Sequence, residues 1–144
     1  MLNKKSGIKE MLKKTPLKRK STSIKKISDK QKIKNEEKKE QTKLRQLLFL
    51  EIWDEREETD SAGNKFVRCF ETGKRMSRGF YRLNSCCYHH VLHKEKHPEF
   101  DLVKENIIIL IPDVHAQVHT NIDKTPKVLE CTKKMKTFLE KEQV

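Results

Sequence analysis

Two short apolar segments in the C-terminal half of the chain have the composition of buried β-strands. Residues 88–92 are aromatic, β-branched and apolar apart from His89 and His90. Residues 106–111 are apolar after Asn106, and Pro112 follows them, where it ends the strand. Runs of this length and composition predict two strands joined by a polar loop.

A long helix is predicted before these strands. Residues 28–31 read Ser-Asp-Lys-Gln, which has the form of a capping box, and neither Gly nor Pro occurs from there to Gly63. We therefore expect one helix over residues 29–58, with an apolar stripe in its second half that packs on the rest of the protein. The stripe consists of Leu44, Leu47, Leu48, Ile52 and Trp53.

Proline marks the start of two further helices. Pro112 and Asp113 suit a first helical turn, where proline is tolerated and a carboxylate faces the positive end of the helix. In this helix His115 and His119 are four residues apart and lie on one face. Pro126 begins a last helix that is predicted to cover the core. Its predicted inward residues are Val128, Leu129, Met135, Phe138 and Leu139.

These elements predict an α+β fold of modest size. A turn at residues 60–64 and a short strand at residues 66–70 complete the elements that precede the histidines. About a hundred residues follow residue 46, which suffices for one core. We expect residues 29–58 to form a helix that packs on this core, and residues 59–144 to form a single small domain that includes the C-terminal helix.

The net charge is concentrated in an N-terminal arm. The chain has 33 Lys and Arg against 21 Asp and Glu, a formal net charge of +12. Residues 1–46 contain 17 basic and 5 acidic residues, and the remainder contains 16 of each, so the whole excess precedes residue 47. We expect residues 1–28 to be disordered, because they cannot bury enough apolar surface to offset the entropy of ordering.

Such an arm would bind nucleic acid by displacing counterions from phosphates, and the alternative is a solubilising tail. Its predicted DNA contacts are Lys18, Arg19, Lys20, Lys25 and Lys26. Further contacts to DNA phosphates are predicted for the basic residues that precede the histidines, because guanidinium groups bind phosphate oxygens in a bidentate way. These are Arg68, Lys74, Arg75, Arg78 and Arg82.

The sequence shows no apolar segment of signal-peptide or membrane-span length. We therefore expect a protein of the cytoplasm that has no membrane partner. The four cysteines, Cys69, Cys86, Cys87 and Cys131, have no disulfide or zinc spacing. Cys86 and Cys87 are predicted to be small buried residues in a reducing compartment, and weak ion binding by Cys69 with one of them is the alternative.

Four histidines carry the strongest chemical signal. Adjacent strand residues point to opposite sides, so one of His89 and His90 can bind a metal ion while the other reaches past it. His115 and His119 have the spacing at which two imidazoles converge on one ion. The alternative is a closed structural zinc site that uses three histidines and one cysteine. His93, which follows the first strand, is predicted to be solvated or to face phosphate.

The order and spacing of these residues resemble the ββα-metal core of HNH nucleases. Fifteen residues separate His90 from Asn106, eight separate Asn106 from His115, and three separate His115 from His119. This spacing is similar to that of colicin-type DNases and many phage HNH proteins, and the basic leader at residues 15–28 resembles that of phage NinG-like proteins. Many relatives carry Cys-x2-Cys-Gly where this chain has Thr72 in place of the second cysteine, so no structural zinc knuckle is expected.

The resemblance implies a role for each matched residue. His89, His115 and His119 would hold one divalent metal ion, His90 would act as the general base, and Asn106 would brace the loop that orients this base. Phosphodiester hydrolysis needs both a Lewis acid and a base such as neutral imidazole. Imidazole ligands favour zinc, nickel or manganese by softness, whereas family habit allows magnesium.

The implied activity is hydrolytic cleavage of DNA that leaves 5′ phosphate and 3′ hydroxyl ends. Similarity to phage NinG-like proteins suggests DNA processing or recombination encoded by a phage or prophage, in the cytoplasm of a bacterial host. A homing or defence nuclease would use the same site. The non-enzymatic alternative is a DNA-binding protein with a structural zinc site. The expected substrates include branched and single-stranded DNA, and the protein is expected to be a monomer or a homodimer.

Overall fold

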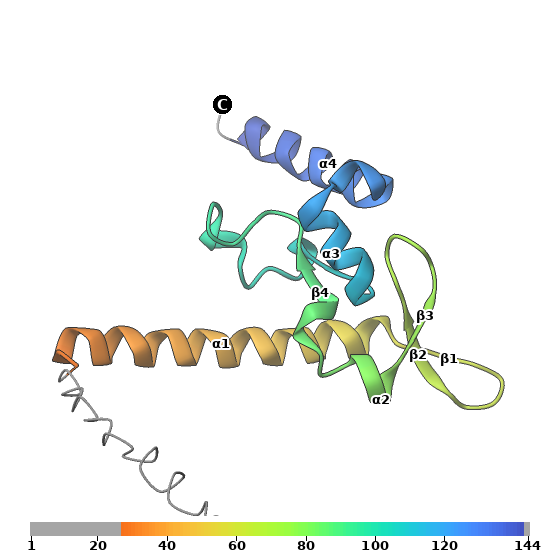
Figure 1. Cartoon of the computed structure of the whole chain (residues 1–144), viewed down its shortest axis with the longest axis horizontal. Helices are drawn as coiled ribbons and strands as arrows, with labels where there is room; N and C mark the ends of the chain where they lie inside the picture. Colours follow the sequence, from red (N-terminus) through yellow and green to blue (C-terminus); the bar gives the residue numbers. More distant parts are fainter. Residues whose placement is uncertain (1–26, 143–144) are drawn as a thin grey trace, which may run out of the picture.

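A computed structural model describes residues 27–142, and these form an α+β fold with two small antiparallel sheets (Figure 1). The predicted α+β class is therefore confirmed, whereas the ββα-metal core stays a prediction. The predicted arm contacts Lys18, Arg19, Lys20, Lys25 and Lys26 lie outside the described residues. The helices and strands are α1 (Asp29–Arg56), β1 (Glu58–Thr59), β2 (Lys65–Arg68), β3 (Arg75–Ser77), α2 (Arg78–Tyr81), β4 (Tyr88–His90), β5 (Ile107–Ile109), α3 (Pro112–Thr120) and α4 (Pro126–Glu142).

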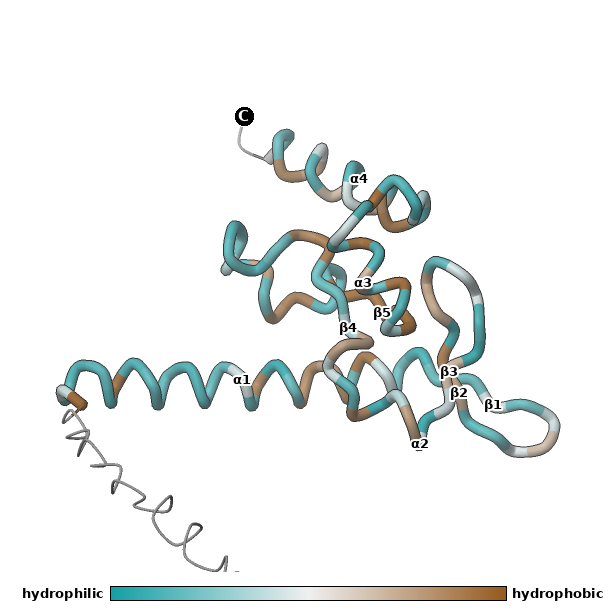
Figure 2. Tube along the Cα trace, viewed as in Figure 1, coloured by the Kyte–Doolittle hydropathy of each residue, from teal (hydrophilic) through white to brown (hydrophobic). Residues whose placement is uncertain are grey.

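The long helix α1 confirms the predicted helix, although it ends at Arg56 and Glu58 already belongs to β1. Ser28 caps it, since its Oγ accepts a hydrogen bond from the Gln31 amide at 3.3 Å. The first turns of α1 extend beyond the rest of the described chain and are mostly hydrophilic (Figures 1 and 2). The second half packs against the core. Within residues 27–142, every helix is either too short or too polar to cross a membrane.

The face of α1 that packs differs from the predicted stripe. Phe49, Ile52 and Trp53 are buried, as spacing of three and four residues requires of one helix face. Leu44 and Leu47 are 48% and 55% exposed, so their inward assignment was wrong. Phe49, which the stripe omitted, lies at the centre of the buried face. The helical repeat then places Leu44 and Leu47 on another side of the helix.

The described chain contains two small sheets, and the first lies near the C-terminal end of α1 (Figure 1). The first has the order β1-β2-β3. Val67 of β2 pairs with Met76 of β3, and both side chains are buried. The turn between β1 and β2 contains Gly63 at a φ of 83°, a backbone conformation that residues with a Cβ rarely adopt. Asp60 stabilises this turn by accepting hydrogen bonds from the amides of Ala62 and Asn64.

The second sheet pairs β4 with β5 and carries the candidate site. Its register places His89 opposite Ile108 and His90 opposite Ile107. Both strands are shorter than predicted, but the Val91 amide donates to the Asn106 carbonyl at 2.8 Å and extends the pairing. All three residues of β5 are buried. Helix α3 begins at Pro112, shortly after β5, and brings the chain back to β4.

One hydrophobic core joins these elements. The Phe49 ring of α1 stacks on Tyr88 of β4 with ring centroids 4.3 Å apart, and Trp53 contacts the same tyrosine edge-on. In α4 only part of the predicted inward face is covered, because Val128 is fully buried whereas Phe138 is 56% exposed. The core therefore lies between the second half of α1, both sheets, α3 and the start of α4.

Candidate active site

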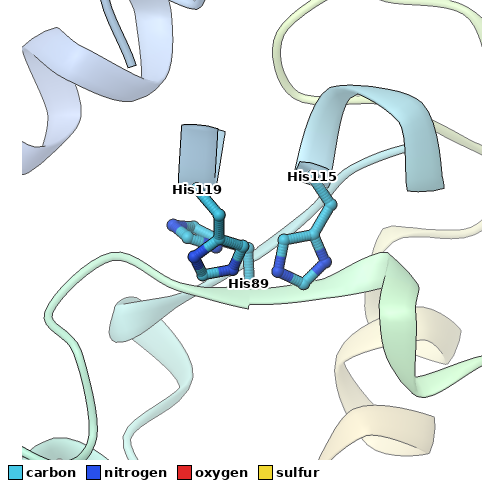
Figure 3. Close-up of side chains that lie close together, drawn as sticks. All are labelled: His89, His115 and His119. Atoms are coloured by element: carbon cyan, nitrogen blue, oxygen red, sulfur yellow. The ribbon is translucent and has the colours of Figure 1, made fainter. Parts of the chain in front are cut away.

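Three histidines from two elements converge. His89 lies in β4, and His115 and His119 lie one turn apart on α3. One ring nitrogen of each residue lies within 4.8 Å of the others, and the three rings face one another (Figure 3). Within residues 27–142 no other group of histidine, cysteine or carboxylate side chains gathers in this way. The structure thus brings together the three residues that the sequence predicted as ligands.

The donor set suits a divalent ion of borderline softness. His115 Nδ1 donates a hydrogen bond to the Cys86 carbonyl, which fixes the tautomer and leaves Nε2 with a free lone pair. Burial, together with His115 and His119, lowers the pKa of His89 to about 3. Burial also lowers the pKa of His119 below its ordinary value. At neutral pH the imidazoles of His89 and His119 are therefore uncharged, the state in which imidazole binds metal.

The low pKa of His89 predicts that acid destabilises the metal-free protein. Below pH 6.5 the unfolded chain takes up a proton at His89 that the folded chain excludes, so stability is complete above pH 6.5 and falls as pH approaches 3. Between pH 6.5 and pH 5 this one residue should remove about 2 kcal/mol from the free energy of unfolding. Urea unfolding with chelator present, over this pH range, measures the loss.

The neutral variant His89→Gln is the matched control for this effect. Its free energy of unfolding should depend less steeply on pH than that of the wild type over the same range, because glutamine does not titrate. Equal slopes for the two proteins would mean that His89 is freely protonated in the folded state.

His90 points away from the histidine cluster. Its Nε2 lies 3.0 Å from the Asp101 carbonyl oxygen and 3.2 Å from Asp101 Oδ1. A carbonyl oxygen only accepts hydrogen bonds, so Nε2 carries the hydrogen and Nδ1 keeps a free lone pair. Burial lowers the pKa of His90 below its ordinary value, and the contacts with Asp101 oppose this only in part. His90 is thus neutral at physiological pH, with one nitrogen able to accept a proton.

Asn106 fixes the loop between β4 and β5. Its side chain is fully buried, and Oδ1 accepts a hydrogen bond from the Leu92 amide at 2.6 Å. Nδ2 donates to the Leu92 carbonyl at 3.1 Å and to the Phe100 carbonyl at 3.0 Å. Phe100 precedes Asp101, so one amide ties both ends of the loop and sets the position of the carbonyl that holds His90.

Asp101 was not predicted from the sequence. It is 3% exposed and accepts two hydrogen bonds from Arg45 of α1, at 2.8 Å and 2.5 Å, and one from Gln41 at 3.3 Å. The hydrogen bonds from Arg45 hold the pKa of Asp101 below its ordinary value, so it is a carboxylate at neutral pH. No sequence pattern could have paired a loop aspartate with a residue 56 positions earlier in a charged helix.

A cavity of about 400 Å³ opens onto these side chains from between α1 and the second sheet. Both His89 and His90 line it, although they belong to opposite faces of β4. None of its described lining residues is acidic. The lining consists of Thr42, Arg45, Gln46, Phe49, Ser85, Cys86, Tyr88, His89, His90, His93, Lys94, His115 and His119.

No family model matches the chain, and no curated protein or solved structure shows significant similarity to it.

The basic residues predicted to contact DNA near β2 and α2 are largely engaged with carboxylates. Arg82 forms a two-hydrogen-bond ion pair with Asp54, at 3.0 Å and 2.6 Å, and Arg78 contacts both Asp54 and Glu57. Arg68 pairs with Glu58, Arg75 pairs with Asp60, and Lys74 forms no ion pair within the described residues. None of the five lines the cavity, so their contact with DNA stays a prediction.

The cysteines differ from expectation at one position. Cys87 is buried, but Cys86 is exposed, so the expectation that both are buried was wrong for Cys86. Burial raises the pKa of the Cys87 thiol to about 11, which keeps it protonated at neutral pH in the metal-free protein. In the described part of the chain, no cysteine joins the three histidines.

Proposed function

We propose that this chain is a metal-dependent endonuclease of the HNH, or ββα-metal, type that hydrolyses DNA phosphodiester bonds. One observation carries the proposal. Three converging imidazoles and a fourth, separately oriented imidazole line the same cavity, and their order along the chain is that of the HNH motif. A ligand cluster beside an independent base is what metal-assisted hydrolysis requires.

His89, His115 and His119 would hold the metal ion. When bound, it would act as a Lewis acid that neutralises charge on the scissile phosphate and on the leaving 3′ oxygen. Three protein ligands leave coordination positions open, which is typical of catalytic sites, whereas a structural zinc site is closed by four. Imidazole donors favour zinc, nickel or manganese over magnesium, and the family resemblance keeps magnesium among the candidates.

His90 would act as the general base. Its Nδ1 would accept a proton from the water that attacks phosphorus, while Nε2 stays bonded to the Asp101 carbonyl. As the ring becomes charged, the Asp101 carboxylate at 3.2 Å would stabilise it. Asn106 would hold the loop, and Arg45 would hold Asp101, so the ring is oriented before substrate binds.

Lys94, which lines the cavity, would bind substrate, whereas Arg45 is paired with Asp101. No acidic side chain lines the cavity among the described residues. A polyanion can therefore enter without like-charge repulsion. DNA processing or recombination of a phage or prophage, in the cytoplasm of its host, is the biological setting that the resemblance to NinG-like proteins suggests.

The test is nicking of supercoiled plasmid, and of a branched and a single-stranded substrate, with magnesium, manganese, nickel or zinc and with excess chelator. We expect cleavage of at least one DNA only when metal is present. His115→Ala should lose both bound metal and activity. Cleavage of none of these substrates, together with tight plasmid binding and one retained zinc, would favour the DNA-binding protein with a structural zinc site.

A further inference from the structure

We propose that the face of α1 around Lys38, Lys39 and Lys43 is a binding track for the phosphate backbone of duplex DNA that extends from the candidate active site. This inference rests on the proposed function, because it concerns the substrate of the same cavity. It names a surface that neither the histidine motif nor the basic residues near β2 and α2 include.

The surface is continuous with the cavity. A second, shallower hollow of about 280 Å³ lies on α1 and is lined by Lys38, Lys39, Thr42, Lys43 and Gln46. Thr42 and Gln46 line the histidine cavity as well. A chain of phosphates that occupies the cavity therefore meets the lysine-lined hollow as it leaves along α1, in the direction of the extended helix end (Figure 1).

The charge of this surface is available to a ligand. Lys38, Lys39 and Lys43 are exposed, and within residues 27–142 none of them forms an ion pair. No acidic residue lines either hollow in the described part of the chain. By contrast, Arg78 and Arg82 are neutralised by Asp54 and Glu57. Uncompensated lysines favour a polyanion, because binding releases its condensed counterions.

The length of the surface fits a duplex. Lys38 and Phe49 are eleven residues apart in one helix, a rise of about 16 Å. One strand of B-DNA carries a phosphate every 3.4 Å of axial rise, so α1 laid along the duplex axis would span about four or five nucleotides over this distance. Lysine binds phosphate as a point charge, and phosphate contacts carry no direct sequence information, so the track should position DNA without sequence preference.

The experiment compares three full-length proteins that all keep the N-terminal arm. They are the wild type, the triple variant Lys38→Gln, Lys39→Gln, Lys43→Gln, and the matched triple variant Lys133→Gln, Lys136→Gln, Lys141→Gln. The last removes three exposed lysines of α4, which lie outside both hollows. Glutamine has nearly the helix propensity of lysine, so both variants should fold, and circular dichroism checks this.

Binding to a short duplex is measured by fluorescence anisotropy with chelator present, as a function of salt. Loss of three phosphate contacts should reduce the slope of log affinity against log salt by about 2 to 3 for the α1 variant, and by much less for the α4 variant. Equal reductions in both variants would show that only net charge matters and would overturn the track.

Two other outcomes would also overturn the proposal. An unchanged slope in the α1 variant would mean that these lysines do not contact DNA phosphates. Absence of duplex binding by the wild type would mean that duplex DNA is not the ligand. The binding measurement involves neither metal nor cleavage. A negative binding result for the α1 variant therefore does not contradict plasmid nicking, and absence of nicking does not change the interpretation of the binding data.

Discussion

Replacement of His90 by alanine is expected to slow DNA cleavage by about 100-fold or more while the bound metal stays at the wild-type level. The reason is that His90 lies outside the ligand cluster and has a free Nδ1, with Nε2 held by the Asp101 carbonyl at 3.0 Å. Alanine removes the proton acceptor and leaves His89, His115 and His119 in place. Single-turnover nicking rates, with metal content measured on the same samples, test this expectation.

His93→Ala is the matched control for His90→Ala. His93 lines the same cavity, but its contact is a local one at 3.4 Å from the Glu95 amide. Its replacement should change the cleavage rate far less than replacement of His90. If His93→Ala were the slower variant, the base would have been assigned to the wrong histidine. Loss of metal from His90→Ala would instead make His90 a ligand.

The second large effect is expected at Asn106. Alanine at this position would leave the buried Leu92 amide and Leu92 carbonyl without a partner, whereas the Phe100 carbonyl would keep its hydrogen bond from the Val103 amide at 3.3 Å. An unsatisfied buried polar group costs about 1–3 kcal/mol, so we expect the free energy of unfolding to fall by about 3 kcal/mol or more. Cleavage should fall as well, because the loop that orients His90 is released. Urea unfolding with chelator present measures the stability.

Asn121→Ala is the comparison for Asn106→Ala. Asn121 is exposed and makes a single capping hydrogen bond, to the Asp123 amide at 3.2 Å, so its loss should cost about 1 kcal/mol. Similar losses for the two variants would mean that Asn106 does not brace the loop. Asn106→Asp would place a buried carboxylate oxygen against the Leu92 and Phe100 carbonyls, so at neutral pH it should lose at least as much stability as the alanine variant.

Local patterns were enough to predict the three longer helices and the strands that carry His89 and Asn106, whereas the joining of His89 with His115 and His119 was implied by the HNH resemblance. The capping box at Ser28 and the proline at Pro112 each mark a helix start that the structure has. The alternation of strand side chains separated His89 from His90, and helical spacing placed His115 beside His119. These relations depend only on residues close in sequence, which is why periodicity could predict them.

Relations between distant elements could not be predicted in this way. The ion pair between Arg45 and Asp101 depends on how α1 crosses the loop, and the sequence contains no signal for that crossing. The same holds for Arg82, which resembles a free phosphate ligand in the sequence but pairs with Asp54 in the structure. Leu44 was misassigned because an apolar residue in a helix need not face the core when Phe49 occupies the inward face.

The contact between α1 and Asp101 determines which fragments of the chain can exist alone. A fragment that starts at residue 59 would contain every histidine of the site and Asn106. It would lack the fully buried Trp53, and its Asp101 carboxylate would have no Arg45 to pair with. A buried charge without its partner destabilises a protein by about 3–5 kcal/mol. This cost is comparable to the whole free energy of unfolding expected of so short a fragment. Truncation after the arm should therefore yield a stable product, whereas truncation at the boundary that the motif suggests should yield an insoluble one.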